Sequence, residues 1–135
     1  MWTCPNCKRE FPIANWRHIC NDITIDDLFA SKPNGLLLAF DELLMAVMQW
    51  EPNTVGAATK AVVFTNKYAW LVVRPMSKEL DVKFYYPEPL QSPFLHKIGK
   101  PYGSKYPHHI RLRDEGDLKP EMVDLLRKGF EFGLR

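Results

Sequence analysis

Apolar residues recur at helical spacing in two long stretches of the chain. Between Pro33 and Trp50 they fall every three or four positions, which predicts a helix whose apolar stripe is Leu36, Leu37, Phe40, Leu43, Leu44, Val47 and Met48. A terminal helix is predicted to open at Asp117 and Pro120, with the stripe Met122, Val123, Leu125, Leu126 and Phe130. A short helix over residues 23–29 follows from TIDD, which has the form of a capping box and places acids in the first turn.

The stretch between these helices alternates between apolar and polar residues, as β-strands do. KAVVFT (60–65) and YAWLVVR (68–74) are rich in β-branched and aromatic residues and flank a predicted hairpin turn. ELDVKFYY (79–86) and HHIRLR (108–113) alternate cleanly. We therefore expect their polar positions to point away from the core; these are Asp81, Lys83, Tyr85, His109, Arg111 and Arg113.

The order helix, helix, antiparallel strands, helix predicts an α+β fold, with an antiparallel sheet of about four to five strands and helices packed on one face. The other face is then open to solvent, and the charges make it basic. Residues 52–113 carry ten Lys and Arg residues against three acids, whereas residues 22–51 carry six acids against Lys32 alone. The candidate ligand-binding residues on this face are Lys60, Lys83, Tyr85, His109, Arg111 and Arg113. Such a surface suits phosphates and stacked bases, although solvated strand faces commonly carry Lys and Arg without binding a ligand.

Length and composition predict an ordinary globular protein. The 135 residues are 46% hydrophobic and 25% charged, which is enough to form one main core. No apolar run approaches the length of about 18 residues needed to cross a bilayer, and the N-terminus lacks the pattern of a signal peptide. We therefore expect a cytoplasmic protein with reduced cysteines, in which clustered thiols indicate a metal before a disulfide.

All three cysteines and one histidine stand within CPNCKREFPIANWRHIC, near the start of the chain. The candidate metal ligands are Cys4, Cys7, His18 and Cys20, spaced Cys-x2-Cys-x10-His-x-Cys. Zinc prefers four such ligands in a tetrahedron, and a Cys-x2-Cys turn supplies two thiolates from one knuckle. The sequence therefore predicts a structural Zn²⁺ in a knuckle of residues 1–22, followed by an α+β domain of residues 23–135.

Three other interpretations fit this segment less well. A redox Cys-x-x-Cys needs a preceding strand that delivers it to a helix N-terminus, yet only three residues precede Cys4. A zinc deaminase needs a His-x-Glu motif, which the chain lacks. A base-reading finger has about 12 residues between its second Cys and its first His and roughly three to five between its last two ligands. Here those gaps are ten residues and one, which favours a closed structural site.

Several segments together resemble the family named domain of unknown function 5655. They are TIDDLFASKP, FDELL, ATKAVVFTNKYAWLVVRPMSKELDVKFYYPEPL and HHIRLRDEGDLKPEMVDLLRKGFEFG, and they fall within residues 24–133. Members often carry an N-terminal knuckle of the form WTCPxC, Phe, His-x-Cys, which residues 2–20 reproduce. The resemblance implies no established activity. Some relatives occur beside nuclease-like domains, which implies a role in nucleic-acid metabolism, and a looser similarity to proteins grouped as iron chaperones implies a small-ligand or metal-delivery role.

Two binding functions are favoured over an enzyme. Alternation sends His108 and His109 to opposite sheet faces, and no nucleophile motif, phosphate loop or carboxylate pair accompanies them, so no catalytic residue is assigned. The leading hypothesis is a non-enzymatic module whose basic sheet face, or the loop over residues 96–107, binds nucleic acid. The alternative is a cleft for a small ligand or a protein segment, lined by Trp70, Tyr85, Tyr102 and Tyr106. Neither hypothesis involves a membrane.

Overall fold

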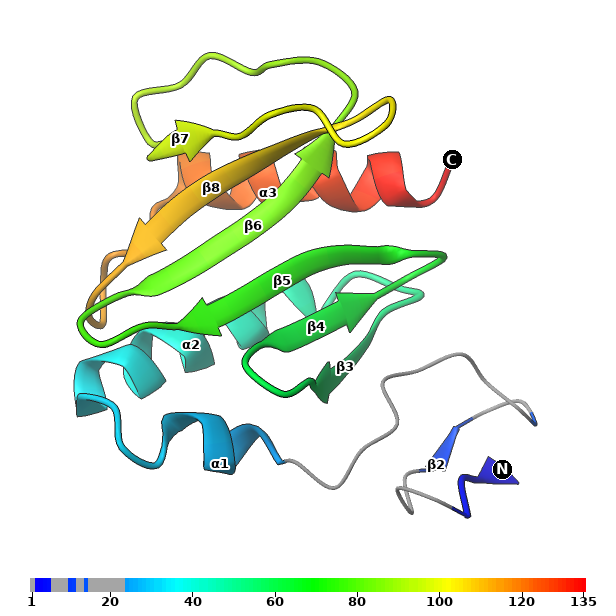
Figure 1. Ribbon diagram of the computed structural model, residues 1–135, viewed down its shortest axis with the longest axis vertical. Helices are drawn as coiled ribbons and strands as arrows, with labels where there is room; N and C mark the ends of the chain where they lie inside the picture. Colours follow the sequence, from blue (N-terminus) through cyan, green and yellow to red (C-terminus); the bar gives the residue numbers. More distant parts are fainter. Residues whose placement is uncertain (1, 6–9, 12–13, 15–23) are drawn as a thin grey trace.

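The computed structural model describes residues 2–5, 10–11, 14 and 24–135. Its main feature is a sheet of six strands in the order β3-β4-β5-β6-β8-β7, in which every neighbouring pair is antiparallel (Figure 1). The strands are β3 (Thr54–Ala57), β4 (Val62–Thr65), β5 (Ala69–Pro75), β6 (Leu80–Tyr86), β7 (Lys97–Ile98) and β8 (Tyr106–Leu112). β6 and β8 pair over their full lengths, from Leu80 opposite Leu112 to Tyr86 opposite Tyr106.

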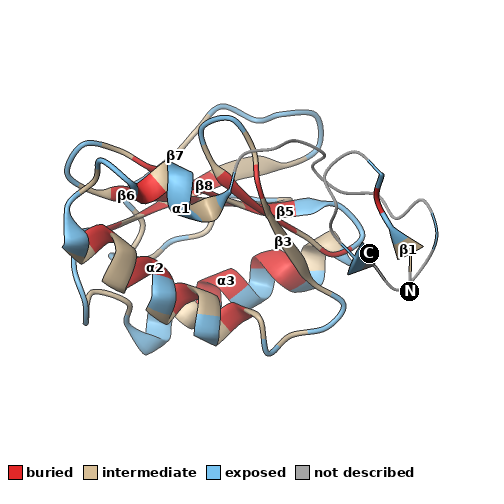
Figure 2. Ribbon diagram, turned by 90° about the horizontal axis from the view of Figure 1, so that it is seen from below, coloured by how far each residue is buried: buried red, intermediate tan, exposed pale blue. Residues whose placement is uncertain are grey.

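The described residues also form three helices: α1 (Ile25–Phe29), α2 (Asn34–Val47) and α3 (Pro120–Gly133). α2 and α3 lie side by side on one face of the sheet (Figure 2). The opposite face is turned toward the viewer in Figure 1, and no helix of the described residues covers it. α1 begins with the predicted capping box, because the Thr24 hydroxyl accepts from the Asp27 N–H and the Asp27 carboxylate accepts from the Thr24 N–H.

The core fills the space between the sheet and the two long helices. Its fully buried members include Leu36, Phe40, Leu43 and Val47 from α2, Leu126 and Phe130 from α3, and Val82, Phe84, Ile110 and Leu112 from β6 and β8. α3 approaches β6 closely at Gly129, where a Cβ atom would lie 2.8 Å from Cδ2 of Phe84. Only glycine fits at this position without a shift of the helix or the ring.

The α+β class, the antiparallel sheet and the helices on one face are confirmed, but the predicted count of four to five strands is wrong. The described residues form a sheet of six strands, because β3 and β7 were not predicted. β3 is the short TVGA segment and β7 is two residues long, so neither shows the alternation from which strands are recognised. Within the described ranges, no helix is long and apolar enough to cross a membrane.

A small hairpin stands at the start of the chain. β1 (Trp2–Thr3) and β2 (Glu10–Phe11) are antiparallel, with Trp2 opposite Phe11. Cys4 follows β1 directly and is buried. The other three predicted zinc ligands, Cys7, His18 and Cys20, lie outside the described residues, so the knuckle over residues 1–22 stays a prediction.

Candidate functional site

The helix-free face of the sheet carries the polar residues that alternation predicted there. Lys83 of β6 stands opposite His109 of β8, and Asp81 stands opposite Arg111. The residues between them along each strand are fully buried against the helices, so these four side chains lie on the open face. Cross-strand partners of this kind have neighbouring Cβ atoms, and here they bring Arg111 into contact with Asp81.

At the end of this face near the β5–β6 turn, both arginines are paired with carboxylates. Arg111 Nε donates to Asp81 Oδ1 at 3.0 Å, and its Nη1 donates to Glu79. Arg113 Nε donates to Glu79 Oε2 at 3.2 Å. The hydrogen bond from Arg111 is the main reason that the pKa of Glu79 lies below its usual value. The charge count of the sequence therefore overstates the free positive charge at this end.

His109 is held by the same buried carboxylate. Its Nδ1 lies 2.9 Å from Oδ1 and 3.1 Å from Oδ2 of Asp81, whose side chain is 8% exposed. An ionised carboxylate only accepts hydrogen bonds, so the proton of the neutral imidazole stands on Nδ1 and the lone pair on Nε2. The ring also lines a hollow of about 370 Å³ whose other walls are Lys83, Tyr85, Lys100, Tyr102 and Pro107.

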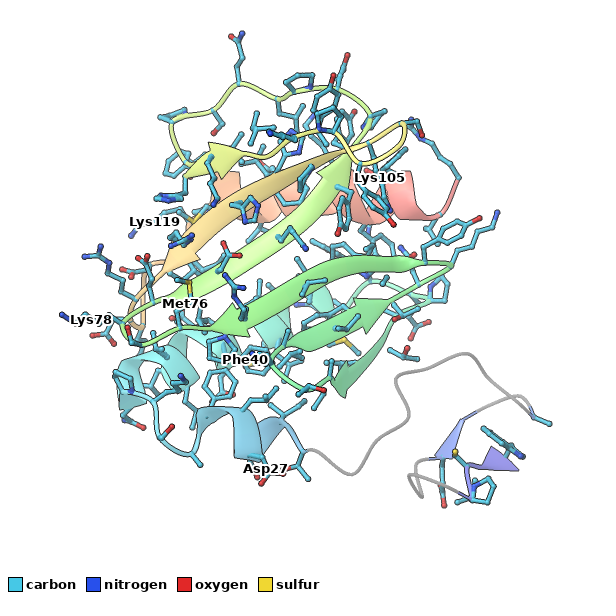
Figure 3. All side chains as sticks on the ribbon, viewed as in Figure 1. Asp27, Phe40, Met76, Lys78, Lys105 and Lys119 are labelled. Carbon is cyan, nitrogen blue, oxygen red and sulfur yellow. The ribbon has the colours of Figure 1, made fainter. Side chains whose placement is uncertain are left out.

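The opposite end of the open face gathers tyrosines and lysines. Lys105 Nζ lies 4.2 Å from the ring centroid of Tyr85 and 5.8 Å from that of Tyr102, and Lys83 Nζ lies 5.6 Å from the Tyr85 centroid. A tight turn presents two of these residues, because the backbones of Tyr102 and Lys105 hydrogen-bond to each other around Gly103, which has a φ of 64°. Figure 3 shows Lys105 beside the ends of β6 and β8. We call Lys83, Tyr85, Lys100, Tyr102 and Lys105 the tyrosine–lysine surface.

A cavity of about 380 Å³ adjoins this surface. It lies between the start of β5, the Tyr102–Lys105 turn and the C-terminal end of α3, and its aromatic walls are Tyr68, Trp70, Tyr85, Tyr102 and Phe132. Lys105 and Arg135 add positive charge to the lining. We call it the aromatic cavity. Of the four residues predicted to line a cleft, Trp70, Tyr85 and Tyr102 do so, whereas Tyr106 is not part of the lining.

The other predicted ligand-binding residue, Lys60, is not part of the tyrosine–lysine surface. It is exposed in the turn between β3 and β4, where it lines a separate hollow with Lys32 and Arg74. The predicted set of ligand-binding residues is therefore divided into three parts. Arg111 and Arg113 are paired with acids, Lys60 lies elsewhere, and Lys83, Tyr85 and His109 stay together. In the described part of the chain, no group of three or more metal-ligating side chains is present.

His108 points to the helix side and has a structural role. Its Nδ1 donates to the Tyr106 carbonyl at 2.8 Å, its Nε2 accepts from the Leu90 N–H at 3.0 Å, and its ring stacks on Phe84. Burial is the main reason that the pKa of His108 lies below its ordinary value of 6.5. Neutral His108 thus links the loop after β6 to the core, because it binds the Leu90 N–H and stacks on Phe84.

Sequence reasoning missed some residues of the site. Asp81 was placed on the open face, but its contact with His109 depends on the register of β6 against β8, which no pattern of single-strand alternation reveals. Lys105, Tyr68 and Phe132 come from three distant parts of the chain and meet only because the C-terminal end of α3 packs beside β5. The sequence did point to the loop over residues 96–107 as a candidate binding segment, and this loop contains Lys100, Tyr102 and Lys105.

Together, the sheet order, the helix-free face and the position of the cavity define the class of protein: an α+β domain whose antiparallel sheet is covered by helices on one side only. Comparison with protein families matches residues 25–133 to the family described as Domain of unknown function (DUF5655), and the chain belongs to that family. Comparisons with curated proteins and with solved structures gave no match.

Proposed function

We propose that this domain binds single-stranded nucleic acid on the tyrosine–lysine surface. The observation that carries the proposal is the position of Lys105, whose ammonium group lies near the rings of both Tyr85 and Tyr102. Proteins that bind single strands without strong sequence preference combine cations that follow the phosphates with rings on which bases stack. The tyrosine–lysine surface offers both on the sheet face opposite α2 and α3.

The lysines of this surface are available for phosphate. None of the ion pairs among the described residues involves Lys83, Lys100 or Lys105. A phosphate that approaches them competes with no ion-paired carboxylate, whereas at Arg111 it would compete with Asp81 and Glu79. This difference favours a path for the strand over the end of the sheet that holds Tyr85.

Exposed rings favour an unpaired strand over a duplex. Tyr102 is 73% exposed and Tyr68 is 50% exposed, so their ring faces are open to an incoming base. The bases of a duplex are already stacked and paired, and they offer a protein only their edges in the grooves. The aromatic cavity has room for one base turned out of the strand, because its volume of about 380 Å³ falls in the range of ordinary ligand pockets.

Fluorescence anisotropy with a labelled oligonucleotide tests this proposal. We expect the full chain to bind a single-stranded 12-mer at about 50 mM salt and to bind a duplex of the same sequence more weakly. Tyr102→Ala should weaken binding about 5- to 150-fold, because one stacked base contributes about 1–3 kcal/mol. Lys128→Ala is the control, since Lys128 is exposed on α3. Equal loss in both variants, or tighter binding of the duplex, would contradict the proposal.

The aromatic cavity also favours a second candidate, a small planar anion such as a mononucleotide. Its walls are mainly aromatic, with Lys105 and Arg135 as the cations that would hold a phosphate or carboxylate. Phe132→Ala should then abolish a thermal shift caused by mononucleotides, because it removes one aromatic wall of the cavity. Thermal shifts with mononucleotides and no binding of oligonucleotides would favour this candidate over the first.

At the N-terminus, we propose that Cys4, Cys7, His18 and Cys20 hold a structural Zn²⁺. Two observations support the fit: Cys4 is buried, and the Cys-x2-Cys pair falls in the connection between β1 and β2, which are hydrogen-bonded to each other. Three thiolates and one imidazole suit a closed tetrahedral zinc site, which leaves no open position for chemistry. The metal would stabilise residues 1–22 and take no part in binding at the sheet.

A further inference from the structure

We propose that His109 and Asp81 make the tyrosine–lysine surface a catalytic site that cleaves RNA at the phosphate next to a 2′-hydroxyl. This inference rests on the proposed function, because the strand must first lie over Lys83 and Lys100. No catalytic residue was assigned from the sequence, because alternation sends His108 and His109 to opposite faces and no nucleophile motif, phosphate loop or carboxylate pair accompanies them. A carboxylate that contacts His109 was not considered. The register of β6 against β8 supplies that carboxylate.

Asp81 is built as a positioning residue for the imidazole. Its side chain is 8% exposed, it accepts from His109 Nδ1 with both oxygens, and Arg111 Nε also donates to Oδ1 at 3.0 Å. The carboxylate is therefore fixed in one orientation, and the ring it holds keeps one tautomer. Nε2, which carries the lone pair, is then the basic atom of the ring, and the ring lines the same hollow as Lys83 and Lys100. A general base needs this arrangement of a held ring beside the bound substrate.

Lysines on both sides of the histidine suit a phosphodiester. Lys83 is the direct cross-strand partner of His109, and Lys100 lines the hollow from the loop before β8. Ammonium groups there would bind the phosphate oxygens and stabilise the charge that grows on them in the transition state. Tyr85 and Tyr102 would hold the two bases that flank the reacting phosphate.

The reaction needs no cofactor and no added reactant. His109 Nε2 takes the proton from the 2′-hydroxyl, the 2′-oxygen attacks the phosphorus, and the bond from phosphorus to the 5′-oxygen breaks. The leaving 5′-oxygen takes a proton from the Lys83 ammonium group, and the His109 imidazolium returns its proton to Lys83 through solvent. The products are a 2′,3′-cyclic phosphate and a free 5′-hydroxyl, so protons and electrons balance.

Single-turnover cleavage of a labelled single-stranded RNA by the full chain, with no metal added, tests the inference. We expect products with a 2′,3′-cyclic phosphate, and no cleavage of the DNA strand of the same sequence. His109→Asn keeps a donor toward Asp81 but has no basic nitrogen, so it should slow cleavage at least about 100-fold. Binding of the DNA strand by this variant should stay within about twofold of the wild type. Lys128→Ala, purified in the same way, should cleave at the wild-type rate.

Two further variants separate catalysis from folding. Cleavage by His109→Ala should recover in part when free imidazole is added, which a structural defect would not allow. Asp81→Asn should lower kcat with little change in KM, because Asp81 orients the base and does not touch the strand. Binding of DNA without cleavage of RNA, or cleavage that persists in His109→Asn, would overturn this inference and leave the proposed function intact. Failure to bind either strand would overturn both.

Discussion

Protonation of His108 is expected to destabilise the folded domain. The side chain is 0% exposed, and the neutral ring uses both nitrogens: Nδ1 donates to the Tyr106 carbonyl and Nε2 accepts from the Leu90 N–H. A proton on Nε2 would remove the acceptor of the Leu90 N–H and place a charge against Phe84 in the core. This is why burial holds the pKa of His108 below 6.5.

The magnitude follows from proton linkage. The unfolded chain binds the proton near the ordinary pKa of 6.5, whereas the folded chain resists it. Because the folded-state pKa is the lower one, the stability that His108 contributes is complete above pH 6.5 and is lost as the pH falls toward that folded-state pKa. Between about pH 7.5 and pH 5.5, one such group can lower the free energy of unfolding by at most about 1.4 kcal/mol.

Urea unfolding of the wild type and of His108→Gln, at both pH values and followed by tryptophan fluorescence, measures this effect. Every other histidine is common to both proteins, so the difference between the two pH dependences isolates His108. At about pH 7.5 the variant should be less stable by about 1–3 kcal/mol, because the buried partners of His108 lose hydrogen bonds. The difference in free energy of unfolding between the two proteins should be smaller at about pH 5.5, because only the wild type loses the contribution of His108. An equal pH dependence in the two proteins, or a gap that widens on acidification, would refute this reasoning.

The close approach of α3 to β6 and the proposed zinc site give two more predictions. Gly129→Ala should lower the free energy of unfolding by about 1–2 kcal/mol in urea titrations, because the added Cβ would lie 2.8 Å from Phe84 and overpacking outweighs the gain in helix propensity; an unchanged or raised stability would contradict this. Native mass spectrometry should find one zinc per chain, and Cys7→Ser should lose it while the circular dichroism of the α+β domain persists. Loss of the helix and sheet signal together with the metal would show that the two parts do not fold separately.

The elements that the sequence predicted well are those whose burial is periodic. α2, α3, β6 and β8 each bury one stripe or one face, so the spacing of apolar residues alone locates them. β3 was missed because TVGA does not alternate between apolar and polar residues. β7 was missed because it has only two residues, which form a strand by pairing with β8. Both segments become strands through pairing with a neighbouring strand, which the sequence pattern of one segment does not reveal.

The candidate site was predicted in its residue types but not in its arrangement. Alternation correctly placed Lys83, Tyr85 and His109 on one face. The pairing of Arg111 with Asp81 and Glu79 was not foreseen, because it depends on which residues stand opposite each other across two strands. For the same reason, Arg111 and Arg113 were expected to share the basic face with the lysines, whereas the structure pairs both arginines with acids.

The salt dependence of single-strand binding tests the central claim most directly. If Lys83, Lys100 and Lys105 each contact one phosphate, the logarithm of the affinity should fall against the logarithm of the salt concentration with a slope of about −2. Lys105→Ala should reduce the size of this slope by about 0.7, and Lys128→Ala should leave it unchanged. No binding at about 50 mM salt, or a slope that Lys105→Ala does not alter, would contradict the assignment of nucleic-acid binding to the tyrosine–lysine surface.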